Sequence, residues 1–260
     1  MPASNRLTSR PPRTFRRSRV NDRRRLSDMV AIVTGSGRGI GRATVELFAR
    51  EGARLVLCSR TAGELHKVLR AIRAAGGTAI GRVTDIGSAR QAQALVRLAV
   101  RQYGRLDLLI NNAGILGPRV PIASYPVREW KEVLRINLSG TFYLSQEAAK
   151  VMAKQAHGCI IMVSSSVGRV GRAGWGAYAV SKFGVEGLSQ VMADELKSAG
   201  ITVMTFNPGG TRTAMRAAAY PREDRRKLQD PSAPAESLLR LALCASPTMS
   251  GKSFDRHTVP

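Results

Sequence analysis

The sequence predicts a single α/β domain, in which a doubly wound parallel sheet of about seven strands has helices on both faces. The main observation is that short apolar runs of strand type alternate with helical patterns from residue 29 onward. Strands separated by helices of this length pair in parallel through right-handed crossovers. The 260 residues, 43% of them hydrophobic, are enough for one packed core. A ligand of such a sheet lies beyond the carboxyl ends of the strands.

The expected elements follow from apolar periodicity. Strands are expected at 30–33, 55–58, 79–83, 106–110, 159–163, 201–206 and 253–255. Helices are expected up to about 50, at 65–72, at 92–103, as two patterns within about 125–156, and at 176–198. Thr61 and Glu64 have the spacing of a capping box.

Two segments depart from this alternation. Residues 1–28 hold nine arginines and almost no large apolar residue, so we expect a disordered Arg-rich extension before a folded domain at 29–260. The extension lacks the apolar segment of a secretory signal, although its composition resembles an organellar transit peptide. A passive tail or a start-site error explains it more simply. Residues 207–251 read as a loop with short helices, which we expect to form a flap on the substrate side.

The net charge of +23 comes from 41 Lys and Arg against 18 Asp and Glu. Such a surplus could bind nucleic acid, an anionic membrane or a phosphorylated ligand. No nucleic-acid motif accompanies it, so we favour a solvated basic surface that reflects arginine-rich codon usage, with any nucleic-acid binding confined to the tail. No apolar run is long enough to span a membrane. Three widely spaced cysteines predict neither disulfides nor a metal site, and they favour the cytoplasm.

A glycine-rich turn lies between the first expected strand and the first helix, with the sequence Gly35-Ser36-Gly37-Arg38-Gly39-Ile40-Gly41. Glycines permit a tight turn and let backbone N–H groups approach a pyrophosphate at the positive end of a helix. At the start of a βαβ unit, a dinucleotide site is a better interpretation than a plain turn.

The end of the second strand indicates which dinucleotide is bound. An acidic residue usually stands there when the ligand is NAD, because it accepts a hydrogen bond from the ribose 2′-hydroxyl. This chain has Ser59-Arg60 instead, and Arg38 lies in the glycine turn. Two guanidiniums suit a 2′-phosphate, so we expect NADP(H) to be favoured over NAD(H). The alternative is that Arg60 only points to solvent.

Tyr178 and Lys182 stand four residues apart at the start of an expected helix, so both project from one face. A tyrosine with its ordinary pKa near ~10 is a poor base at neutral pH. A cation held close favours the phenolate, and the pair then makes a usable proton donor and acceptor. Ser165, thirteen residues upstream, ends the fifth strand at the edge where ligands bind.

These motifs together resemble the short-chain dehydrogenase/reductase family in order and spacing, from about Met29 to Thr213. The motifs are Thr34-Gly35-x-x-x-Gly39-x-Gly41, Asn111-Asn112-Ala113-Gly114, Ser165 and Tyr178-x-x-x-Lys182. The resemblance implies a Rossmann fold and an oxidoreductase that moves a hydride between a nicotinamide and a carbonyl or secondary alcohol.

The resemblance also implies roles for single residues. Tyr178 transfers the proton, Lys182 lowers the tyrosine pKa and binds the nicotinamide ribose, and Ser165 hydrogen-bonds the substrate oxygen. Asn137 matches the asparagine that holds a water for the proton relay. The implied cofactor set is Gly35, Ser36, Arg38, Gly39, Ile40, Gly41, Ser59, Arg60, Asp85, Ile86, Asn111, Ala113, Gly114, Tyr178, Lys182, Pro208, Gly209, Thr211 and Thr213.

The family pattern is not matched everywhere. Thr211 stands where the family commonly has Val or Ile, and the chain ends without the usual Gly-Gly strand terminus. A homodimer through the helices around 138–156 and 176–198 is implied, whereas a tetramer stays open. Trp175 either lines the substrate cleft or simply packs.

Three functions compete. The leading one is an NADP(H)-dependent oxidoreductase of unknown small-molecule substrate. A 3-oxoacyl-[acyl-carrier-protein] reductase is the alternative within the enzyme class, since an acidic carrier suits a basic surface. A dinucleotide-sensing binding protein without catalysis is the alternative from another class, but Asn137, Ser165, Tyr178 and Lys182 are all present.

Overall fold

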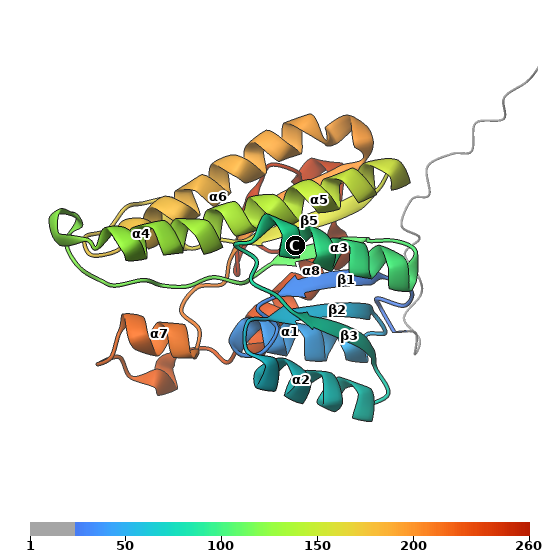
Figure 1. The fold of residues 1–260 in the computed structure, drawn as a ribbon, viewed down its shortest axis with the longest axis horizontal. Helices are drawn as coiled ribbons and strands as arrows, with labels where there is room; N and C mark the ends of the chain where they lie inside the picture. The colour runs from blue at the N-terminus through green and yellow to red at the C-terminus, as the bar shows by residue number, and fades with distance from the viewer. Residues whose placement is uncertain (1–23) are drawn as a thin grey trace, which may run out of the picture.

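The computed structural model describes residues 24–260, which form one parallel sheet with helices on both sides (Figure 1). The seven strands have the order β3-β2-β1-β4-β5-β6-β7, and every neighbouring pair is parallel. The strands are β1 Val30–Thr34, β2 Arg54–Ser59, β3 Thr78–Val83, β4 Leu108–Asn111, β5 Gly158–Val163, β6 Ile201–Asn207 and β7 Ser253–Asp255. The doubly wound Rossmann fold is confirmed.

Helices cover both faces of the sheet, as Figure 1 shows. One face carries α1 Gly39–Arg50, α2 Ala62–Ala74 and α8 Ser232–Cys244, and the other carries α3 Ala89–Tyr103, α5 Gly140–Gln155 and α6 Gly176–Glu195. Side chains of β2 alternate between the two cores: Leu55 and Leu57 face α1 and α2, whereas Val56 and Cys58 face the opposite way. Burial on both faces explains why the strands read as continuous apolar runs.

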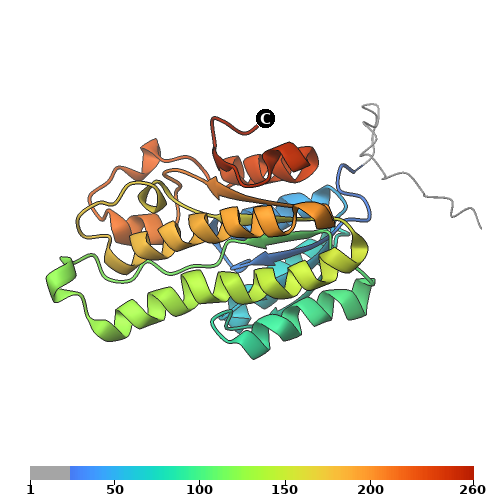
Figure 2. The same cartoon turned by 90° about the horizontal axis from the view of Figure 1, so that it is seen from above.

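The two helical patterns expected within 125–156 form one long continuous helix (Figure 2). Helix α4, Val127–Leu134, passes into α5 through a π-helical segment, Arg135–Ser139. Such π segments occur frequently at functional sites. This one contains Asn137.

The expected flap at 207–251 is wrong for its second half. Short helix α7, Ala214–Ala219, does project from the body of the molecule (Figure 1). Helix α8, however, packs against α1, and Leu238, Leu239 and Leu241 are fully buried. These leucines form an apolar helix face that needs a partner, and the sheet provides it.

The expected disorder of 1–28 is wrong for residues 24–28, and residues 1–23 lie outside the described part. Leu26 is 1% exposed, and its backbone N–H donates to the carbonyl oxygen of Glu51 at 2.9 Å. The Glu51 carboxylate also accepts hydrogen bonds from the Arg25 backbone and guanidinium. This short turn is therefore part of the folded domain.

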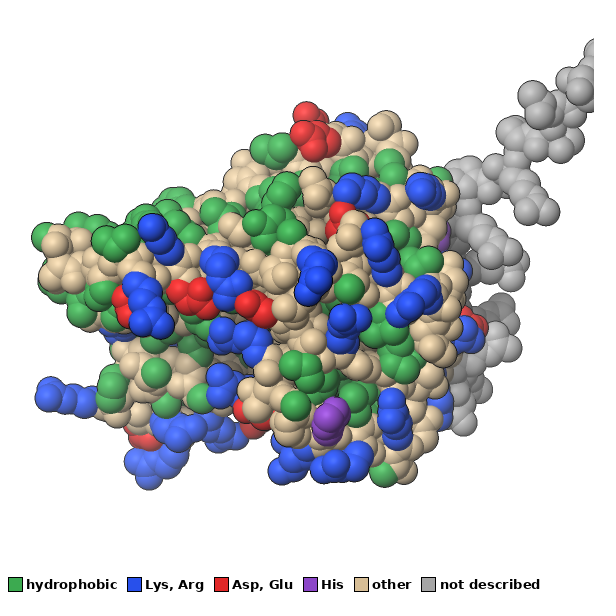
Figure 3. All heavy atoms as spheres, viewed as in Figure 1, with side chains coloured by type: hydrophobic (Ala, Val, Ile, Leu, Met, Phe, Trp, Pro, Cys, Tyr) green, Lys and Arg blue, Asp and Glu red, His purple; other side chains and the backbone are tan. Residues whose placement is uncertain are grey.

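Basic side chains are spread over the face shown in Figure 3, among hydrophobic and uncharged areas, without a single dominant patch.

In the described range 24–260, none of the helices has the length and apolar character needed to cross a bilayer.

Candidate functional site

The glycine-rich turn joins β1 to α1 where the strand order reverses between β1 and β4. Gly35 and Gly39 have φ values of 67° and 55°, in the left-handed region that favours glycine. A Cβ atom on Gly41 would collide with the carbonyl oxygen of Gly35. The turn therefore has the compact shape that lets a pyrophosphate approach the N-terminus of α1.

Ser36 supports this turn from within. Its hydroxyl donates to the carbonyl oxygen of Val33, and its backbone N–H donates to the carbonyl oxygen of Cys58 at 2.9 Å. The side chain is completely buried. Ser36 thus fixes the turn against β2, and its polar atoms are already engaged within the protein. Ile40 packs, partly buried, against the core on the α1 side.

The two arginines expected at a 2′-phosphate each have a carboxylate beside them. Arg38 Nη1 lies 3.8 Å from Glu64 Oε1, and Arg60 Nη1 lies 3.8 Å from Glu132 Oε1. The Arg38 side chain is 74% exposed and the Arg60 side chain 51% exposed, so both ion pairs are weak and screened by solvent. Both guanidiniums are therefore available to a stronger anion. The carboxylates come from α2 and α4, and nothing in the sequence spacing indicated them.

The start of α2 differs from the expected capping box. Thr61 is the N-cap residue, but its side chain accepts no hydrogen bond from the helix, and its own N–H donates to Ser59 Oγ at 3.2 Å. The Glu64 carboxylate instead lies beside Gly37: a Cβ atom there would be 2.9 Å from Glu64 Oε2 and 3.0 Å from Ser59 Oγ. The capping-box prediction is therefore wrong, because Glu64 faces the glycine turn.

On the expected adenine side, Asp85 is held at both oxygens. Arg135 Nη1 lies 2.8 Å from Asp85 Oδ2, and the Gly87 N–H donates to Oδ1 at 3.0 Å. Arg135 also binds Glu132, and this hydrogen bond lowers the pKa of the Glu132 carboxyl. Ile86 is buried in the core on the α5 side.

After β4, the chain is tied to the end of β1. Thr34 Oγ1 accepts hydrogen bonds from the N–H groups of Asn112 and Ala113, at 3.0 and 2.9 Å. Asn112 Nδ2 also donates to the Thr34 carbonyl oxygen. The side chain of Asn111 points instead toward α5, where it donates to Ser145 Oγ at 2.9 Å. Thr34 is thus a positioning residue, a role that was not assigned to it from the sequence.

Tyr178 and Lys182 lie one turn apart at the start of α6, and both are buried. Lys182 Nζ is 5.7 Å from the centroid of the Tyr178 ring and donates to the carbonyl oxygen of Val163 at 2.7 Å. Ser165 is the second residue after β5, just before the short turn Ser166–Gly168. The structure therefore brings these three predicted residues together at the carboxyl end of β5.

Burial dominates the protonation of this pair. It raises the pKa of Tyr178 to about 12, and a hydrogen bond with the Ser165 side chain opposes that rise. It lowers the pKa of Lys182 to about 8, and the charge of Glu186 opposes that fall. Desolvation is the larger influence on the phenol in this arrangement, and the role of the lysine in lowering the pKa of the tyrosine stays a prediction.

Asn137, in the π-helical segment, is completely buried and engaged at both ends of its amide. Its Oδ1 accepts from the Ile115 N–H at 2.8 Å, and its Nδ2 donates to the Ile115 carbonyl oxygen and to Ser181 Oγ. Ser181 in turn donates to the Tyr178 carbonyl oxygen. Asn137 thus joins α6 to the loop after β4, and the water-holding role stays a prediction.

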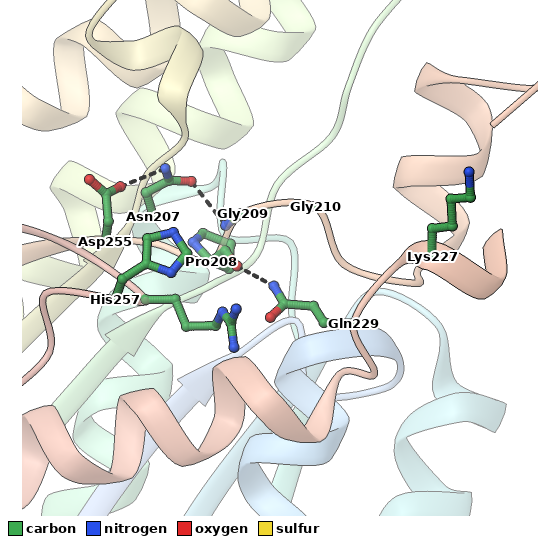
Figure 4. Close-up of a pocket in the computed structure, with 9 residues that line it drawn as sticks. Asn207, Pro208, Gly209, Gly210, Lys227, Gln229, Asp255 and His257 are labelled. Atoms are coloured by element: carbon green, nitrogen blue, oxygen red, sulfur yellow. Dashed lines mark hydrogen bonds between the residues drawn. The ribbon is translucent and has the colours of Figure 1, made fainter. Parts of the chain in front are cut away.

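The segment after β6 lines a cavity of about 250 Å³ (Figure 4). Gln229 Nε2 donates to the carbonyl oxygen of Pro208 and, at 3.0 Å, to Thr211 Oγ1. Thr213 is the N-cap residue of α7, and its methyl group would lie 3.2 Å from a Cβ atom on Gly39. The start of α7 therefore lies against the glycine turn. The cavity is lined by Asn207, Pro208, Gly209, Gly210, Lys227, Gln229, Asp255, Arg256 and His257.

Next to Tyr178, aromatic side chains form a wall. The ring of Trp175 lies 5.6 Å from that of Tyr178 and 5.9 Å from that of Tyr220, between centroids. Val167 and Ala219 complete this small apolar cluster. Trp175 is only 7% exposed. Of the two roles left open for it, the structure shows packing within this cluster.

The chain is similar to known proteins over most of its length. The family model described as short chain dehydrogenase matches residues 29–224. The uncharacterized oxidoreductase YciK of Escherichia coli is 40% identical over 234 residues, which cover 88% of this chain and 92% of YciK. A 3-oxoacyl-[acyl-carrier-protein] reductase of Synechocystis is 34% identical over 191 residues, covering 73% and 77% of the two chains. The structure of a short chain dehydrogenase from Shigella flexneri, complexed with NADP, is 37% identical with a TM-score of 0.83, covering 91% of this chain and 100% of that one.

Proposed function

The chain belongs to the short-chain dehydrogenase/reductase family, and we propose that it is an NADP(H)-dependent enzyme that interconverts a small carbonyl compound and its secondary alcohol. The observation that carries this proposal is the convergence of Ser165, Tyr178 and Lys182 at the carboxyl end of β5. The glycine turn lies at the same edge of the sheet, after β1, with β4 between the two strands. Such an arrangement aligns a proton donor with a bound dinucleotide.

The fit of the dinucleotide rests on the cradle after β1. Side chains at Gly35, Gly39 and Gly41 would be strained or would collide with neighbouring atoms, so the backbone is left open to a pyrophosphate. Arg38 and Arg60, with only weak carboxylate partners, would hold a 2′-phosphate. The NADP in the Shigella flexneri structure supports this choice of dinucleotide. When bound, the nicotinamide would supply or accept the hydride.

The protein's own residues handle the proton. The phenol of Tyr178 is protonated at neutral pH, as burial raises its pKa further above neutrality, to about 12, so it suits the reduction of a carbonyl. The phenol would donate its proton to the oxygen of the substrate as negative charge develops there. The Ser165 hydroxyl would donate a second hydrogen bond to that oxygen. Lys182, anchored on Val163, would provide a positive charge beside the phenolate that remains.

Two related proposals concern the whole enzyme. The outer faces of α5 and α6 expose Phe142, Phe183 and Val191, with 38%, 45% and 55% of their surface accessible. Exposed apolar residues on neighbouring helices support a homodimer through this face. All three cysteines are free thiols, which supports a reducing compartment such as the cytoplasm.

The alternative functions make different demands. A 3-oxoacyl-[acyl-carrier-protein] reductase would need a docking surface for its acidic carrier, and the relative from Synechocystis gives only general family support. A sensing protein would not need the proton donor. Tyr178 is buried beside Lys182 and Ser165, as proton transfer requires, so we favour the enzyme.

The decisive test is Tyr178→Phe. NADPH oxidation with a panel of ketones should fall by about 10²–10⁴-fold, because the proton donor is lost. Binding of NADPH, measured by fluorescence titration, should stay within a factor of about two because the ring is retained. A variant that keeps most of its turnover would show that another group transfers the proton.

A further inference from the structure

Arg119 fixes a positive charge near the proposed proton donor. It comes from the loop after β4, and its Cζ lies 4.5 Å from the centroid of the Trp175 ring and 4.9 Å from that of Tyr220. Its Nη1 donates to the carbonyl oxygen of Ala219, at the end of α7. Trp175 in turn packs against Tyr178. The guanidinium is therefore held one aromatic ring away from the phenol.

The charge of Arg119 is not neutralised by the part of the protein that the structure describes. Among residues 24–260 it forms no ion pair, whereas two arginines in or next to α7 do. Arg216, which lies 4.0 Å over the Tyr220 ring, is bound by both oxygens of Glu223, and Arg212 is bound by Asp230. Arg119 thus differs from these arginines in having charge available for a ligand.

The side chains that separate Arg119 from Tyr178 are apolar and largely buried. They are Val167, Trp175 and Ala219, and Leu116 packs against them. Arg119 is exposed, but the two aromatic rings exclude water from part of its guanidinium, so an anion bound there is screened less than at a fully hydrated cation. Because Arg119 is already fixed by two rings and a carbonyl oxygen, binding an anion there costs little side-chain entropy.

We propose that Arg119 is a specificity-determining residue that binds a carboxylate at the far end of the substrate. The enzyme would then act on keto acids and hydroxy acids whose carbonyl or alcohol is separated from the carboxylate by an apolar body, such as a ring. This inference rests on the proposed oxidoreductase function. The hydrogen bond to Ala219 uses one of five guanidinium N–H donors, and the remaining donors suit the two oxygens of a carboxylate.

A purely structural role is the competing explanation. Through Ala219, Arg119 connects the loop after β4 to α7, so its removal could loosen the cleft for every substrate alike. The two roles differ in one respect: only a carboxylate-binding role distinguishes a charged substrate from its neutral ester.

The test therefore uses matched substrates with the full chain and NADPH. They are 4-oxocyclohexanecarboxylate and 4-acetylbenzoate, each paired with its methyl ester. The wild type should favour both acids. In Arg119→Gln, kcat/KM for the acids should fall at least about tenfold, mainly through KM, while the esters change less than about threefold; tenfold corresponds to about 1.4 kcal/mol. Arg119→Lys, which keeps the charge, should recover part of the loss.

A control variant and a binding measurement complete the design. Arg222→Gln removes an exposed positive charge from the segment just after α7 and should leave the preference for acids unchanged. Calorimetric titration with 4-oxocyclohexanecarboxylate should show binding that is at least tenfold weaker in Arg119→Gln. This readout does not need turnover, so binding without reduction would refute the proposed function and still support the role of Arg119.

Three results would overturn the inference. One is an equal loss with acids and esters, which would make Arg119 a structural link. The second is a wild type that does not favour the acids in either turnover or binding. The third is a preference for 4-acetylphenyl phosphate over 4-acetylbenzoate that disappears in Arg119→Gln, which would assign the residue to a phosphate instead.

Discussion

At the scale of single residues, the buried carboxylate of Glu186 has a consequence for Lys182, one helical turn before it. Glu186 accepts hydrogen bonds from Thr205 at 2.7 Å and from Ser253, and it pairs with Arg169, whose guanidinium also binds Asp255. Its negative charge opposes the desolvation that lowers the pKa of Lys182 to about 8. Glu186 therefore helps to keep the lysine protonated near neutral pH.

The variant Glu186→Gln tests this relation. Without the carboxylate, the pKa of Lys182 should fall further below about 8, so less of the lysine is protonated at a given alkaline pH. The alkaline limb of the kcat/KM profile should therefore move to lower pH, with little change near pH 6, at which the lysine stays protonated in both proteins. Asp194→Asn, an exposed change on the same helix, is the control. An unmoved alkaline limb would show that Glu186 has only a structural role.

At the scale of elements, α8 belongs to the core and should contribute to stability. Leu239 is fully buried between α1 and the sheet. Leu239→Ala should lower the free energy of unfolding by about 2–5 kcal/mol, because it removes buried apolar surface and leaves a cavity. Urea denaturation measures this change, with the exposed Glu236→Ala on the same helix as the control. A loss below about 1 kcal/mol would mean that α8 is a detachable flap after all.

The comparison of sequence and structure is clearest at this scale. Apolar runs were sufficient to predict all seven strands, including β7, which has only three residues. The assignment of α8 failed because its leucines follow a loop rich in proline and charge, and periodicity does not say whether a helix face meets the sheet. Motif spacing located Ser165, Tyr178 and Lys182. It could not predict the contacts of Glu64, Glu132 or Arg119, because their partners come from distant segments of the chain.

At the scale of the whole molecule, the basic character belongs mostly to the folded domain. Only seven of the 41 Lys and Arg residues lie in 1–23. The domain itself begins before the first strand, because Leu26 and Arg25 attach the chain to the end of α1 through Glu51. The boundary of the folded domain is therefore at about residue 24, several residues earlier than composition indicated.

Two truncations test where the domain begins. Removing residues 1–23 should change the free energy of unfolding by less than about 0.5 kcal/mol, since the contacts of the Arg24–Asp28 turn with Glu51 are kept. Removing residues 1–28 exposes the site where Leu26 is buried and deletes the partners of Glu51, so stability should fall by about 1.5–3 kcal/mol. Urea denaturation of both proteins measures the difference, and Leu26→Ala in the full chain provides the matched single change. If both truncations were equally stable, the turn would contribute nothing to the fold. If removing residues 1–23 were already enough to destabilise the protein, the domain would begin before residue 24.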